Sequence, residues 1–506
     1  MGRGPVLYYQ IVVYSYNNNY MTRFRSASLV IAVLSVPVAL PAQTAQTAQV
    51  AQVDRSAQRV GALSLRDALA RADAHAFANR IADGRADVQA GEALAAYRGI
   101  LPSVRVEAGF VRTTDPIGAF GTTLRQRAIT AADFDPARLN FPAAVGNRSA
   151  GLVLEQPLFN ADAWMGRRAG AAATGAARAG AEWTRRGTST DVIRAYFGAT
   201  LAREKRSTLD AAERAAQAHV ARARALSDTG LVTRSDVLLA EVRAGEITAQ
   251  RLAATGEAEH AARALAVLLG EPGSSNELPT TLPTADAIRA LVAGDTSETT
   301  GETTGERAGD DAAMYTGQTG TRADVRAATL AVDASRADTR RARAAYLPRV
   351  NGFARYDWND PRAYFANERS WTVGVMASWS PFAGASEIAE VRATSGRART
   401  AVAQFEAATA QAGLETARTR TELQVALAQL DIAERAVAQS VEAHRIVVLK
   451  YDGGLATISE LLEASALETQ SRLSASFATY RLLVTAAERR QALGADPAFL
   501  ATLTTP

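Results

Sequence analysis

Glu460 and Glu463 are the residues whose type and spacing most suggest chemistry, and they follow shortly after Gly454. Residues three apart share one face of a helix, so the two carboxylates would lie close together. Two neighbouring carboxylates would attract cations. A second interpretation is local, because Thr457-Ile-Ser-Glu460 has the sequence of a capping box at a helix start. The residues leave both interpretations open.

Other residue types that catalyse reactions or bind metals are sparse. The chain has no cysteine, and neither lysine follows a glycine-rich turn that would cradle a phosphate. The histidines are scattered, without paired-ligand spacing, at His75, His219, His260 and His444. His219 and His260 could face each other across a helical hairpin, but surface positions are the more ordinary outcome. We therefore expect no catalytic residue, no metal site, no cofactor and no enzymatic activity.

Composition favours long, closely packed helices. Of the 506 residues, 47% are hydrophobic but only 6% are aromatic, and alanine supplies much of the apolar content. The 56 basic residues nearly balance the 52 acidic ones, giving a net charge of +4. This balance argues against a nucleic-acid-binding protein.

The N-terminal region reads as an export signal. Arg23 and Arg25 precede a short apolar run that ends near a small-residue cleavage site, so we assign 1–42 to a signal region with translation starting at Met21. An N-terminal anchor helix is the alternative. Residues 43–62 form a polar spacer.

The remaining chain is a duplication. Gly-Leu-Val-Thr-Arg-Ser-Asp at 230–236 corresponds to Gly-Leu-Ala-Thr-Ile-Ser-Glu at 454–460, and a Gly-to-Phe segment at 151–159 corresponds to 374–382. The two offsets agree within one residue, which indicates an internal repeat. The first half has extra residues at 117–148, between its two segments of alternating apolar and polar residues.

Each repeat reads as helix, strand, loop, strand, very long helix, tight turn and return helix. We place the first repeat at 63–270 and the second at 322–494. A low-complexity linker, 271–321, separates them, and 495–506 is a tail. The first helices are expected at 64–100 and 323–346, the strands at about 102–116, 148–159, 348–358 and 370–382, and the later helices at about 160–229, 235–270, 383–452 and 455–494.

The expected strands alternate apolar and polar residues, so each has one wet face. Trp371 and Trp379 lie at the two ends of one apolar face, roughly 26 Å apart at ~3.3 Å per residue. That separation fits aromatic girdles at the two surfaces of a bilayer. A soluble four-stranded sheet with two core tryptophans remains the alternative. Four strands are too few to close a membrane barrel within one chain.

These motifs resemble the TolC-like outer membrane efflux family. The resemblance rests on the Leu-Pro strand starts, the Gln-Pro-Leu-Phe strand end, the two Gly-Leu turns and the duplication, and it covers Leu63–Leu493. It implies a mainly α fold with a small transmembrane β part, in which a homotrimer forms a twelve-stranded β-barrel continued by a periplasmic α-helical tunnel.

The resemblance also implies a function. Such a protein is the exit duct of a tripartite efflux system in the outer membrane of a Gram-negative bacterium. It contacts outer-membrane lipid, a periplasmic adaptor protein and an inner-membrane pump, passes small molecules passively, and binds no nucleic acid. Two alternatives stay open: the outer-membrane component of a type I protein secretion system, and a periplasmic coiled-coil scaffold without a pore.

Site residues follow from the same resemblance. The pore gate would be formed by Glu460 and Glu463. Tyr451 and Asp236 match positions that link neighbouring hairpins, but their usual arginine partner is replaced by Ala456, which leaves Arg234 as the candidate substitute. The adaptor-docking turns would comprise Gly230, Leu231, Val232, Gly454 and Leu455. Good helix ends alone would also account for these turns.

Overall fold

The computed structural model describes residues 62–274, 276–300, 322–366 and 368–504. The expected signal region, 1–42, lies outside these residues, as do 43–61 of the spacer and 301–321 of the linker. The structure is described below for the body that these residues form.

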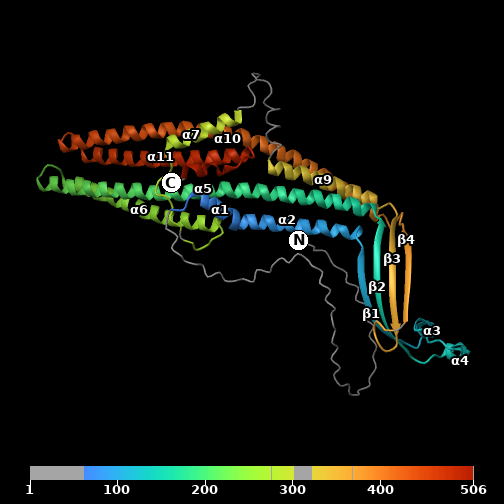
Figure 1. Ribbon diagram of the computed structural model, residues 1–506. Helices are drawn as coiled ribbons and strands as arrows, with labels where there is room; N and C mark the ends of the chain where they lie inside the picture. Colours follow the sequence, from blue (N-terminus) through green and yellow to red (C-terminus); the bar gives the residue numbers. More distant parts are fainter. Residues whose placement is uncertain (1–61, 275, 301–321, 367, 505–506) are drawn as a thin grey trace, which may run out of the picture. The chain divides into compact units, whose positions relative to one another are not determined.

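Two very long helices dominate the fold (Figure 1). α5 (Ala161–Asp228) and α10 (Ser386–Asp452) have 68 and 67 residues, which corresponds to about 100 Å each at ~1.5 Å per residue. No described residue of either helix is a proline, so each backbone hydrogen-bond ladder continues from end to end. None of the described helices combines the length and the apolar composition that crossing a membrane requires.

Shorter helices pack along these two. The return helices of the hairpins are α6 (Arg234–Leu268) and α11 (Ile458–Ala492). The other α-helices within the described residues are α1 (Leu65–His75), α2 (Phe77–Ala95), α3 (Pro116–Arg125), α4 (Pro136–Asn140), α7 (Ala285–Thr300) and α9 (Ala323–Ala344). Short 3-10 turns occur at η1 (Ala96–Gly99), η2 (Ala131–Phe134) and η3 (Pro497–Thr504). α2 and α9 lie beside the part of α5 nearest the sheet, and α6 lies beside its far part.

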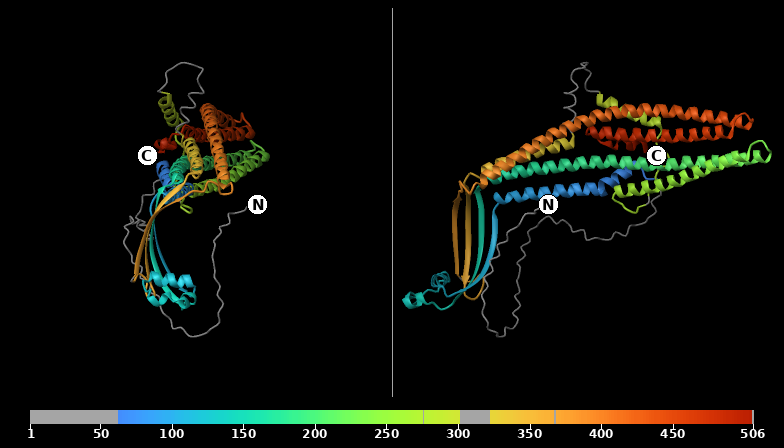
Figure 2. Two further views of the ribbon diagram at one scale, coloured as in Figure 1. Left: turned by 90° about the vertical axis from the view of Figure 1, so that its right-hand side faces the viewer. Right: turned by 180° about the vertical axis from the view of Figure 1, so that it is seen from behind.

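The strands form one antiparallel sheet at the end of the long helices (Figures 1 and 2). The sheet has the order β1-β2-β3-β4, so consecutive strands are neighbours and β1 and β4 are its edges. The strands are β1 (Ser103–Thr113), β2 (Val145–Phe159), β3 (Arg349–Asp360) and β4 (Glu368–Ser378). β1 and β2 come from the first repeat and β3 and β4 from the second, and β2 joins the repeats by pairing with β3.

Two apolar clusters hold the helices together. The middle core gathers α1, α5, α7, α10, α11 and the chain end around Ile193, Phe197, Leu430 and Leu482. The tip core lies where the two helical hairpins turn. It consists of Val220, Ala223, Val237, Ala240, Tyr451, Ile458, Leu461 and Leu462. Many other buried positions on α5 and α10 are alanine or threonine, which lets the helix axes approach closely.

Each return helix ends at a glycine that touches the start of its own repeat. Gly270 has a φ of 78°, and a Cβ built there would lie 2.1 Å from the carbonyl oxygen of His75. Gly494 has a φ of 73°, and its Cβ would lie 3.1 Å from Cγ of Arg322. Both positions therefore need glycine for backbone conformation and for close approach.

The structure differs from the sequence-based expectation in three segments. The expected helix 64–100 is interrupted at Ala76, whose ψ of 132° ends α1 before α2 begins. The expected linker 271–321 contains the helix α7, and its Ile288 is fully buried in the middle core. The long loop of the first repeat contains α3 and α4. The break at Ala76 and the burial of Ile288 involve distant parts of the chain, whereas α3 and α4 each begin at a local aspartate cap followed by proline.

Candidate functional site

The sheet presents one apolar and one polar face. Paired residues in an antiparallel sheet point to the same side, and Val106 pairs with Leu152, which pairs with Tyr356, which pairs with Trp371. The apolar sheet face is defined by large exposed side chains of this register: Val104, Val106, Phe110, Leu152, Leu154, Trp371, Val373 and Val375. No described residue packs over them closely enough to bury them.

The opposite face carries charge. Arg355 bonds Asp357 at 2.8 Å on its own strand, and its guanidinium lies 3.7 Å from Glu107 of β1. Glu155 accepts a hydrogen bond from Asn351 at 3.2 Å. These residues alternate along the strands with those of the apolar sheet face. The sheet is therefore wet on one side and apolar on the other, and both of its edges are open.

The segment between β1 and β2 is anchored over one end of the polar face. The Gln126 amide donates to Oδ1 of Asn147, and Asn147 in turn donates to Oδ1 of Asn359, both at 2.9 Å. Arg127 forms an ion pair of 3.1 Å with Glu368 at the start of β4. The segment thus reaches from one edge strand to the other.

The two tryptophans expected at the girdles are both exposed, one within β4 and one just after it. Trp371 is 72% exposed within β4, and Trp379, one residue beyond the strand, is 64% exposed. The indole of Trp379 donates to the carbonyl oxygen of Tyr346 at 3.0 Å. Both rings remain available to surroundings outside the chain.

The hairpin turns lie at the other end of the long helices (Figure 2). Gly230 and Gly454 have positive φ angles of 76° and 70° and reverse the chain after α5 and α10. Leu231 and Leu455, the next residues, are 73% and 82% exposed. Large apolar side chains therefore project from both turns.

The acidic residues after each turn close a capping box. The Thr457 N–H donates to Oε2 of Glu460 at 2.7 Å, and the Thr233 N–H donates to Oδ2 of Asp236 at 2.9 Å. The hydrogen bonds from the backbone and side chain of Thr457 lower the pKa of Glu460. Glu463 is exposed on the same helix.

The remaining residues expected at the gate are not brought together in one network. Tyr451 is buried in the tip core, and its hydroxyl has no hydrogen-bond partner among the described residues. Burial raises the pKa of Tyr451, and the carboxylate of Asp236 on the other hairpin adds to the rise. Arg234 is exposed and forms no ion pair with a residue that the structure describes.

An ion pair that the sequence did not reveal joins the hairpins instead. Arg222 of α5 pairs with Asp452 of α10, directly after Tyr451. His219, one turn before Arg222, faces His444 of α10 and not the exposed His260. The duplication carries a signal for this pair, because His219 precedes its turn glycine by 11 residues and His444 precedes its own by 10.

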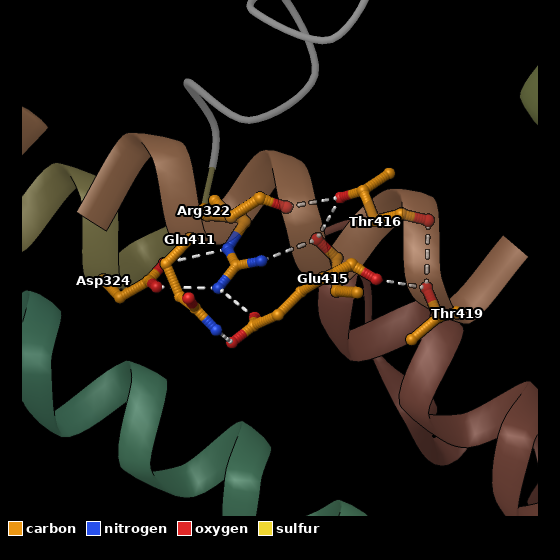
Figure 3. A network of polar contacts seen from close by, with 8 residues as sticks. Arg322, Asp324, Gln411, Glu415, Thr416 and Thr419 are labelled. Atoms are coloured by element: carbon orange, nitrogen blue, oxygen red, sulfur yellow. Dashed lines mark hydrogen bonds and ion pairs between the residues drawn. The ribbon is translucent and has the colours of Figure 1, made fainter. Parts of the chain in front are cut away.

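A buried arginine fixes the start of the second repeat (Figure 3). Arg322 is 1% exposed, and its guanidinium bonds Asp324 at 2.8 and 3.0 Å and Glu415 of α10 at 2.9 Å. It also donates to the carbonyl oxygen of Ala492 at 3.1 Å and lies over the ring of Trp183. One side chain therefore connects α5, α9, α10 and the end of α11.

No group of three or more metal-ligating side chains occurs among the described residues. The structure instead assembles exposed turns, an amphipathic sheet and long helices.

Solved structures share this fold. The outer membrane protein VceC from Vibrio cholerae aligns with a TM-score of 0.67 and 21% identity, over 85% of this chain and 96% of that one. The CmeC outer membrane channel of Campylobacter jejuni aligns at 0.68 with 15% identity, over 85% of each chain. The open state of the MtrE outer membrane channel of Neisseria gonorrhoeae aligns at 0.66 with 17% identity, over 86% of this chain and 89% of that one. These similarities establish the fold.

A comparison with curated proteins gave no match. The sequence does match the family described as outer membrane efflux protein, over residues 73–271 and 319–495, which include the sheet, both helical hairpins and both turns. The expected mainly α fold with a small sheet and long tunnel-type helices is thereby confirmed. The protein belongs to the outer membrane efflux protein family and is a transport channel of the outer membrane.

Proposed function

We propose that three copies of this chain form the exit duct of a tripartite efflux system, which passes small molecules out of the cell. The observation that carries the proposal is the sheet, whose exposed apolar face and two open edges lie at the end of about 100 Å of helix. In this arrangement the sheets would close a twelve-stranded barrel, and the helices would continue it as a tunnel through the periplasm.

The physical reason is that the backbone N–H and C=O groups of the edge strands need hydrogen-bond partners. β1 and β4 each have one unpaired edge within the chain, and unpaired backbone groups are not tolerated in lipid. Pairing β4 of one copy with β1 of the next satisfies both edges and leaves the apolar sheet face toward lipid. Trp371 and Trp379 would then lie at the two membrane surfaces.

The hairpin turns are the proposed contact with a periplasmic adaptor protein, which connects the duct to an inner-membrane pump. Gly230, Leu231 and Val232 form one turn and Gly454 and Leu455 the other. Leu231 and Leu455 are highly exposed at the two turns, so both side chains are available for contact with another protein.

Glu460 and Glu463 are the proposed acidic ring of the gate, with Tyr451, Asp236 and Arg234 as the surrounding hairpin contacts. Glu460 already serves its capping box, whereas Glu463 is exposed without that duty. Glu463 is therefore the better probe of the ring, because its replacement leaves the helix cap intact.

The assembly is tested by fractionation and by gels of heated and unheated samples. We expect an outer-membrane species of three times the chain mass that separates into single chains on boiling. A species that is a monomer in both lanes and needs no detergent would refute the duct and favour a scaffold without a pore.

The gate is tested by conductance in planar bilayers. Glu463→Gln should reduce the preference for cations, because each copy loses one charge from the ring. Asp228→Asn is the matched control, since it removes one exposed charge at the end of α5 on the other hairpin. Equal effects of the two variants would contradict a specific role for Glu463. Export of an unfolded protein instead of small molecules, measured in cells, would favour a type I secretion duct.

A further inference from the structure

Two histidines, one from each repeat, face each other on the side of the tip core that is nearer to the sheet. His219 of α5 and His444 of α10 have ring centroids 6.0 Å apart at an interplanar angle of 72°. Nε2 of each ring is buried and has no hydrogen-bond partner among the described residues. The contact joins one helical hairpin to the other, so it can separate only if the hairpins do.

One histidine has a carboxylate partner. Nδ1 of His444 lies 2.6 Å from Oε2 of Glu468 on α11. The other oxygen of Glu468 accepts from Arg472 at 2.8 Å. His444 therefore lies beside a carboxylate that already has one positive neighbour.

The other histidine, His219, has no carboxylate among the groups that shift its pKa. Arg222, one turn along α5, adds its charge to the surroundings of His219, although it is bound to Asp452 of α10. On α6, which packs against α5, Glu241 is bound to Arg224. Burial lowers the pKa of His219, and His444 and Arg222 lower it further.

The pair lies at the boundary of the tip core that is nearer to the sheet. His219 directly precedes Val220 of the tip core, and His444 lies seven residues before Tyr451, or about 10 Å along the helix. Between the pair and the hairpin turns, the tip core and the Arg222–Asp452 ion pair connect the same two helices. A charge placed on His219 would act directly on this connection.

We propose that the His219–His444 pair is a proton-sensitive contact that holds the two helical hairpins together when His219 is neutral and separates them when His219 is protonated. The inference that separation opens the channel rests on the proposed gate at the hairpin tips. The separation itself is a property of the chain and does not require that gate.

The direction of the pH effect follows from the surroundings of His219. In the packed contact its pKa lies below the ordinary value, which is about 6.5 for histidine. Separation returns the ring to water and its pKa toward that value, so the packed state binds fewer protons. The contact is therefore strongest above about pH 6.5, and the ratio of separated to packed hairpins rises by up to ~10-fold for each pH unit below it.

The experiment measures the distance between the hairpin tips. The chain has no cysteine, so Leu231→Cys and Leu455→Cys provide two unique sites for spin labels, one on each exposed turn. Labelled chains are diluted among unlabelled ones in detergent, and distances are measured by pulsed electron paramagnetic resonance at pH 7.5 and 5.0. We expect a longer, broader distribution at pH 5.0, which disappears in the double variant His219→Gln, His444→Gln.

The other two histidines supply the control. His75 and His260 are exposed, and the variant His75→Gln, His260→Gln should respond to pH as the unmodified protein does. A double variant of His219 and His444 that still responds to pH, or an unmodified protein that does not, would overturn the proposal. If that double variant does not fold, His219→Gln alone decides the question, because it removes the charge that lacks a carboxylate.

Conductance between pH 7.5 and 5.0 separates this inference from the proposed function. A distance change without any pore would contradict the duct but support the proton-sensitive contact. A working pore with no pH-dependent distance change would support the duct and refute the contact.

Discussion

Replacing Arg322 with alanine would test whether a single side chain fixes the start of the second repeat. The substitution removes the guanidinium that joins Asp324, Glu415 and the carbonyl oxygen of Ala492 (Figure 3). Burial is the largest influence on the pKa of Arg322 and lowers it, but bonds to the two carboxylates outweigh burial and raise it. The guanidinium is thus charged, and its loss leaves two carboxylates facing each other.

The magnitude follows from burial. Removing one partner of a buried ion pair destabilises by ~3–5 kcal/mol. The side chains of Asp324 and Glu415 are 23% and 30% exposed, so water can reach them and the lower end, about 3 kcal/mol, applies. That free energy corresponds to an increase of about 100-fold in local opening, at ~1.4 kcal/mol per factor of ten. Arg322→Lys keeps the charge but loses the planar fork, and we expect an effect of about 10-fold.

Hydrogen exchange of the α9 amides measures this opening, because α9 begins directly after Arg322. Arg340→Ala is the matched control, since Arg340 is exposed on the same helix. Exchange within threefold of the unmodified protein in Arg322→Ala would refute the reasoning, because the network would then contribute nothing to holding α9.

Three further predictions concern the helix ends and the tip core. Gly270→Ala should destabilise the protein by more than about 2 kcal/mol, because a Cβ would collide with backbone at a positive φ. Gly256→Ala within α6 is the control, because a Cβ has open space there, and it should be neutral or stabilise the protein by up to ~1 kcal/mol. Thermal unfolding distinguishes the two variants. Tyr451→Phe should leave thermal stability unchanged or slightly higher, because the hydroxyl is buried without a hydrogen-bond partner among the described residues. A large loss of stability would instead reveal a hydrogen bond of this hydroxyl in the assembly. The pKa of Glu460 is lowered by its hydrogen bonds from Thr457, so its contribution to the helix cap is complete above its ordinary pKa and is lost as pH falls through the lowered one. Amide exchange at the start of α11 should therefore show an intact cap at pH 6 and a lost cap below about pH 4. Loss of the cap already near pH 6 would contradict this assignment.

Sequence periodicity was informative where structure is local. Alternation in 349–360 and 368–378 reflects a sheet with one apolar face, and the long proline-free stretches reflect α5 and α10. The turn glycines could be recognised because a helix reversal needs a left-handed residue at a defined place. The observed strand and helix bounds differ from the expected ones by a few residues at each end.

The missing features are those that depend on contacts between parts of the chain that are distant in sequence. Arg322 is one of many arginines, and its burial results from Asp324, Glu415 and Trp183, which are distant from one another in the sequence. The break at Ala76 follows from the close approach of Gly270. No local pattern encodes such contacts. The signal for His219 and His444 was present in the duplication but needed the two repeats to be superposed.

The apolar sheet face has a consequence for the order in which the protein folds. The helices bury their own middle core within one chain, whereas the sheet leaves large apolar side chains and two open edges without a partner in that chain. In water such a sheet would recruit other strands indiscriminately. The helical part is therefore expected to form first, during passage through the periplasm, and the strands to complete their pairing last, when lipid and neighbouring copies meet. Refolding in water should then give native helix content by circular dichroism while Trp371 and Trp379 stay accessible to a quencher until lipid is added. Early protection of these two rings without lipid would contradict this order of events.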